Sequence, residues 1–152
     1  MRVETLEDAL EWARRTHVRL AGQIERDLGK VTNERSRMLL DYLAKHERTL
    51  SETLEMTRHD ASPAALHTWC YEYFENAPSH PESHEAADFR ELAPDAIMRK
   101  VLAEHEHIGD LFRYLRDQVE PPTAHELIDN LLSLEEHETM RLVRDAERME
   151  DL

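Results

Sequence analysis

The sequence predicts an all-α protein: an antiparallel four-helix bundle built from two hairpins, with a long, partly helical crossover between the second and third helices. The 152-residue chain contains only three Gly and six Pro, and 34% of its residues are charged. Four long segments also repeat apolar residues at helical spacing, which is typical of amphipathic helices. The length matches a single domain over 1–152. The long helices are expected at about 4–28, 33–59, 95–119 and 123–150, with the crossover at 60–94.

Capping residues mark the ends of the first hairpin. Thr5 is a favourable N-cap for the first helix, Asp8 supplies an acid in its first turn, and Gly29 follows its last residue. Thr32 or Asn33 caps the second helix. Because the connection is short, we expect these two helices to pack as antiparallel neighbours.

The crossover contains two shorter helical patterns. Ser62 and Pro63 predict an N-cap and first turn of a helix through Phe74, and a second amphipathic piece covers 82–92. Aromatic side chains gather in the first piece, and such rings are common in protein interfaces. They are Trp69, Tyr71, Tyr73 and Phe74. We therefore expect this segment to pack on the bundle or to contribute to a homodimer.

Prolines delimit the second hairpin. The crossover ends at Pro94 and the third helix follows it, and Pro121 and Pro122 separate that helix from the fourth. Thr123 and Glu126 have the spacing of a capping box, so the fourth helix is predicted to begin there.

Charge and composition exclude several classes of function. A net charge of −14 disfavours nucleic acid and anionic membranes as partners, since both require a basic face. No apolar run is long enough to span a bilayer and the N-terminal segment lacks the apolar core of a signal peptide, so a soluble, cytoplasmic protein is expected. No activated Ser or Cys nucleophile and no Gly-rich phosphate loop is evident.

Histidines occupy positions in the helices that are otherwise apolar. His17, His46 and His105 each fall on the core-facing stripe of their own helix. On the fourth helix either His137 or Glu138 faces inward, and periodicity alone does not choose between them. The predicted core therefore contains several titratable side chains.

These histidines are also expected at one height in the bundle. His17 and His46 lie nearly equally far from the turn between their helices, and His105 and His137 lie equally far from theirs. Since each helical residue adds about 1.5 Å, the imidazoles should meet in one layer near the middle. The carboxylates that flank them are Glu47, Glu106 and Glu138.

Burying so many titratable groups is costly unless they share a cation or a closed hydrogen-bond network. Imidazole nitrogen and carboxylate oxygen suit a transition metal, with iron preferred and Mn or Zn as further choices, whereas Ca²⁺ and Mg²⁺ favour oxygen alone. The predicted ligands are His17, His46, Glu47, His105, Glu106, His137 and Glu138. The alternative is a metal-free, dimeric bundle that serves as a structural or protein-interaction module, with the polar layer fixing helix register.

The order of two hairpins and a long crossover, with a ligand-type residue at the middle of each helix, resembles the ferritin-like superfamily that includes rubrerythrins. The resemblance implies an iron centre and redox or oxygen chemistry. The family holds two irons with a Glu on two helices and Glu-x-x-His on the other two. Here Glu104-x-x-His107 is the one such motif on a predicted bundle helix, and Leu43 and Leu134 precede His46 and His137 at that spacing.

Hemerythrin-like bundles, which ligate iron mainly through histidine, are a second resemblance. The segment "LAEHEHIGDLFRYL" is similar to their helices. Their second ligand four residues after a histidine is replaced here by Leu50, Gly109 and Arg141. If a metal binds, these departures favour one ligand from each helix and a single ion.

Overall fold

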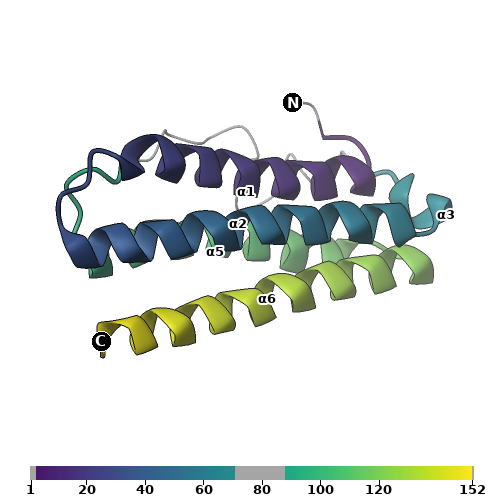
Figure 1. Cartoon of the computed structure of the whole chain (residues 1–152). Helices are drawn as coiled ribbons and strands as arrows, with labels where there is room; N and C mark the ends of the chain where they lie inside the picture. The colour runs from purple at the N-terminus through teal and green to yellow at the C-terminus, as the bar shows by residue number, and fades with distance from the viewer. Residues whose placement is uncertain (1–2, 71–87, 152) are drawn as a thin grey trace.

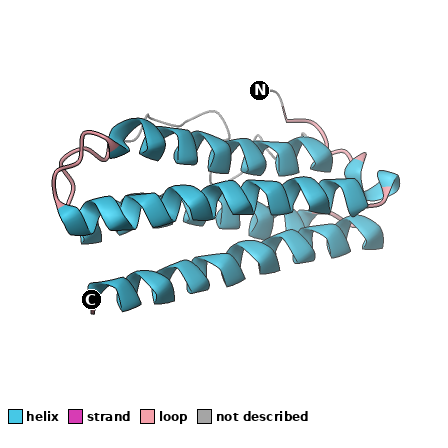
Figure 2. Cartoon of the chain, viewed as in Figure 1, coloured by secondary structure: helices cyan, strands magenta, loops and turns pink. Residues whose placement is uncertain are grey.

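Four long helices and one short helix form the described part of the chain, which covers residues 3–70 and 88–151 of a computed structural model (Figures 1 and 2). The elements are α1 (Leu6–Leu28), α2 (Glu34–Asp60), α3 (Pro63–Leu66), α5 (Pro94–Gln118) and α6 (Pro122–Glu150). The ends of the long helices differ from the expected bounds by at most two residues. The predicted all-α four-helix bundle is confirmed.

The two hairpins are joined so that α2 and α5 run in the same direction. The connection after α2 begins beside the start of α1, where the backbone N–H of Leu6 donates to the carbonyl of Thr68. Its other end lies beside the end of α1, where the N–H of Phe89 donates to the carboxylate of Asp27 at 3.1 Å. The crossover therefore links opposite ends of the bundle, an arrangement that ferritin-like bundles share.

Side-chain caps fix the start of the first hairpin's helices. Thr5 and Asp8 form a reciprocal capping box, and Asn33 accepts a hydrogen bond from the backbone of Ser36. The capping box predicted at Thr123 is wrong, because α6 already begins at Pro122 and has no side-chain cap. Proline has a backbone angle suited to the first helical position, so the helix starts one residue earlier.

The helical content predicted for the crossover is only partly correct. Ser62 caps α3 as expected, but the helix ends at Leu66 and does not continue through the described residues that follow. Residues 88–92 form a turn where the end of a second helix was expected. The remainder of both predictions, including Tyr71, Tyr73 and Phe74, lies outside the described residues, and Trp69 is 54% exposed.

The apolar core is divided into two clusters along the bundle axis. One cluster lies toward the α3 end and includes Leu10, Leu54, Ile108, Phe112 and Leu131. The other lies toward the α1–α2 turn and includes Leu20, Leu43, Val101 and Leu142. In each long helix, a polar residue separates the members of the two clusters. No helix in the described ranges combines the length and the apolar character that crossing a membrane requires.

Candidate metal centre

A layer of buried polar side chains separates the two apolar clusters, and each long helix contributes one. The layer consists of His17 from α1, Glu47 from α2, His105 from α5 and Glu135 from α6. All four residues are at most 3% exposed. Histidines and carboxylates therefore meet where water cannot solvate them, and each must be stabilised by the others or by a bound ion.

His17 lies between two carboxylates. Its Nδ1 atom is 2.5 Å from Oε2 of Glu47, and its Nε2 atom is 2.9 Å from Oε1 of Glu135. An ionised carboxylate only accepts hydrogen bonds, so both ring nitrogens carry protons and the ring is an imidazolium. Burial by itself lowers the pKa of His17, but the charges of Glu135 and Glu47 and the two hydrogen bonds outweigh it and raise the pKa to about 10.

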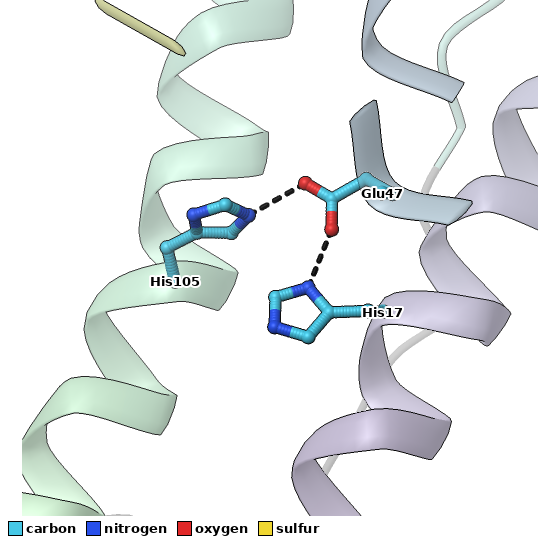
Figure 3. A group of neighbouring side chains, drawn as sticks. All are labelled: His17, Glu47 and His105. Carbon is cyan, nitrogen blue, oxygen red and sulfur yellow. Dashed lines mark hydrogen bonds and ion pairs between the residues drawn. The ribbon is translucent and has the colours of Figure 1, made fainter. Parts of the chain in front are cut away.

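Glu47 joins the two histidines (Figure 3). Its second oxygen, Oε1, lies 2.5 Å from Nε2 of His105, and the rings of His17 and His105 are perpendicular with their centres 5.1 Å apart. Burial opposes ionisation of Glu47, but the charges of His105 and His17 and their hydrogen bonds prevail and hold its pKa far below the usual range. Glu47 is therefore a carboxylate that both imidazoles contact.

The hydroxyl of Thr139 orients His105 from the other side. Its Oγ1 atom lies 2.9 Å from Nδ1 of His105, so Nε2 is directed at Glu47. Metal-binding histidines are commonly held in this way, with one nitrogen bonded to a polar group and the other facing the ion.

Two observations test whether this layer fits a transition metal. One ligand atom from each of His17, Glu47 and His105 lies within 4.8 Å of the others. The Oε2 atom of Glu135 is buried and accepts no hydrogen bond from the described residues. A nitrogen-rich set with a spare carboxylate oxygen is a donor set that iron or zinc accepts, so the layer fits metal binding.

The other predicted ligands lie at the edge of this layer or outside it. His46 and Glu138 are half-buried and face each other, with Nε2 of His46 3.7 Å from Oε2 of Glu138. Burial lowers the pKa of His46. Glu106 and His137 are exposed, because each lies on the outer face of its helix. The structure thus brings together three of the seven expected residues.

Glu135 was not among the residues predicted from the sequence. The prediction for the fourth helix was that His137 or Glu138 faces inward, whereas the buried face of α6 includes Leu131, Glu135 and Leu142. A helix buries more than one strict row of residues, and the steps of four and three from Leu131 through Glu135 to Glu138 also follow the helical period. A wider buried stripe would have indicated Glu135.

The fold is similar to that of a solved structure from Thermotoga maritima, provisionally described as a ferritin-like diiron-carboxylate protein. The two chains are 15% identical, the match covers 94% of this chain and 95% of the other, and the TM-score is 0.58. No family model matches the sequence, and no curated protein matches it. The chain therefore has a ferritin-like fold, as the sequence resemblance implied.

Proposed function

We propose that this protein binds one transition-metal ion, with iron as the first choice, in the layer between its two apolar clusters. The ligands would be His17, Glu47 and His105, with Glu135 as a further carboxylate. The convergence of the first three within 4.8 Å carries the proposal. The orphaned oxygen of Glu135 supports it, because a buried carboxylate oxygen without a partner is costly.

The donor set indicates the class of metal. Two imidazoles and one carboxylate are the ligands of many non-haem Fe(II) sites, and zinc uses the same set. Calcium and magnesium favour oxygen ligands only. The description of the Thermotoga maritima protein as a diiron-carboxylate protein supports iron over zinc. Manganese is a further choice.

A single ion fits this chain better than two. Ferritin-like di-iron centres place a histidine three residues after the carboxylate on two of their helices. In this sequence Leu50 follows Glu47 at that spacing, and Glu138 follows Glu135. The histidine that would accompany each of these carboxylates is thus absent at those positions, which supports a mononuclear site.

The side chains of the layer have distinct parts in binding. His17 must release one of its two ring protons before a nitrogen can bind a cation, whereas Thr139 keeps the His105 ring in place. Glu47 already contacts both imidazoles, so it can neutralise a cation between them. A bound iron ion would supply redox or oxygen chemistry.

Elemental analysis tests this proposal. Protein prepared without a histidine tag and exposed to Fe²⁺, Mn²⁺ or Zn²⁺ should retain about one ion per chain and unfold at higher temperature, because a ligand that binds only the folded state stabilises it. His105→Gln should lose the ion, and His137→Gln, an exposed histidine on α6, should keep it. Wild-type protein without a stoichiometric ion would refute the proposal.

The second candidate is the metal-free bundle, and the position of His17 favours it. An imidazolium between Glu47 and Glu135 already compensates two buried carboxylates, so the layer can exist without a cation. It would then serve to fix the register of the four helices. A homodimer and a cytoplasmic location stay predictions from the sequence. Under this model chelators leave the melting temperature unchanged.

A further inference from the structure

A cleft between α5 and α6 connects the surface with the buried layer. Its volume is about 280 Å³. Buried or half-buried residues form the inner wall, and charged residues that are exposed or half-buried form the mouth. The inner wall includes His105, Glu135 and Thr139, and the mouth includes Glu106, Arg113 and Glu136.

The inner wall includes a residue of the layer with one carboxylate oxygen that has no hydrogen-bond partner among the described residues. Glu135 is 1% exposed, and its Oε2 atom accepts no hydrogen bond from any described residue. His105 lies beside it on the same wall and contacts Glu47 deeper in the bundle. A cation that reached this wall would therefore meet a carboxylate oxygen that accepts no hydrogen bond from the described residues and an imidazole on the same wall.

The guanidinium of Arg113 lies at the mouth and connects the two helices. Its Nη1 atom is 2.7 Å from Asp110 on α5, and its Nε atom is 3.5 Å from Glu136 on α6. Gly109 leaves room for it, because a Cβ atom at that position would lie 3.0 Å from Nη2 of Arg113. Asp110 and Glu136 therefore hold the guanidinium in place, and it occupies space that a side chain at Gly109 would fill.

We propose that this cleft is the access route by which a divalent transition-metal cation reaches the buried layer, and that Arg113 is a gate across it. The inference rests on the proposed function, since it concerns how the same site is filled. Glu106, Glu135 and Glu136 outnumber Arg113 along the cleft, so it attracts cations. The guanidinium at its mouth repels them until it swings outward, which limits the rate of binding and not the final occupancy.

Stopped-flow loading with cobalt(II), followed by its visible absorption, tests the gate. Arg113→Gln should load roughly ten times faster than wild type, a change within the usual range of electrostatic effects on association rates. Arg99→Gln is the matched control, since it removes the same charge from an exposed site on α5. Both variants should reach the wild-type occupancy, and added salt should reduce the difference between them.

A second pair of variants tests the route without relying on Arg113. Met140 lines the cleft and is 72% exposed, so Met140→Trp should obstruct the mouth and slow loading several-fold. Met56→Trp, at an exposed methionine on α2, is the control. If wild type binds cobalt but both test variants load at the rates of their controls, the route is wrong and the metal site stands. If wild type binds no cobalt, the metal site and the route fall together.

Discussion

The carboxylate of Glu47 on α2 lies 2.5 Å from Nδ1 of His17 on α1, and neither side chain is exposed to solvent. Removing two charges from water costs several kcal/mol for each ion, and their attraction offsets that cost only when the geometry is good. Here the pair extends to Glu135 and His105, so every long helix contributes to one chain of contacts. Because this chain of contacts runs through all four long helices, it fixes their positions relative to one another along the bundle axis.

Replacing His17 should destabilise the metal-free protein strongly. His17→Leu leaves Glu47 and Glu135 without their shared cation, and removing one partner of a buried ion pair costs about 3–5 kcal/mol. Urea unfolding followed by circular dichroism measures the change. His137→Leu, at an exposed position, should change the free energy of unfolding by less than about 0.5 kcal/mol. Equal losses in the two variants would contradict a charged layer.

Glu47→Gln should lower the pKa of His17. The substitution keeps the shape of the side chain but removes one of the two carboxylates that raise this pKa to about 10. Titration of the histidine ring signals by NMR, in metal-free protein, measures the shift directly. Glu138→Gln is the control, because Glu138 faces His46 and not His17. A His17 pKa that stays unchanged in Glu47→Gln would show that Glu47 does not stabilise the imidazolium.

The stability of the metal-free protein should decrease as pH rises from about 6.5 to about 10. In this range folded His17 retains a proton that the unfolded chain releases, because the pKa is raised from 6.5 to about 10. The contribution is complete below the unfolded pKa and is lost as pH rises through the folded one, with a slope of at most about 1.4 kcal/mol per pH unit.

Denaturant unfolding at several pH values checks this dependence against the His17→Leu variant. Titrating groups outside the layer contribute equally to both proteins, so the wild-type curve should fall more steeply with pH than that of the variant. Parallel curves would mean that His17 has similar pKa values in the folded and unfolded states.

The helices could be predicted from the sequence because their signals are local. Amphipathic spacing and residues such as Pro94 or Asn33 act within one or two turns, and α2 and α5 begin close to where these residues indicate.

The crossover was harder to predict from the sequence. Ser62 starts α3 as expected, but no local pattern shows that the Phe89 ring is buried or that its backbone N–H binds Asp27. Those are tertiary contacts between segments far apart in sequence.

The candidate site could be predicted only to within a few residues. Equal distance from the turn within each hairpin predicted a layer near the middle of the bundle, and His17 and His105 both lie in it. It did not determine the rotation of each helix about its axis. On α2 the buried polar residue of the layer is Glu47 and not the neighbouring His46, and on α6 it is Glu135 and not His137 or Glu138. One residue turns a side chain by about 100°, so packing between helices makes this choice.

Metal binding should release a proton, because His17 must exchange one for the cation. Near pH 7.5, between the ordinary pKa of histidine and the raised value of about 10, we expect about one proton per bound ion. The affinity for the metal ion should then increase up to tenfold for each pH unit in this range.

Calorimetric titration with Zn²⁺ in buffers of different ionisation enthalpy measures the number of protons released. His46→Gln should release the same number, since burial lowers the pKa of His46 and leaves it neutral at this pH. Binding without proton release would place the ion away from His17.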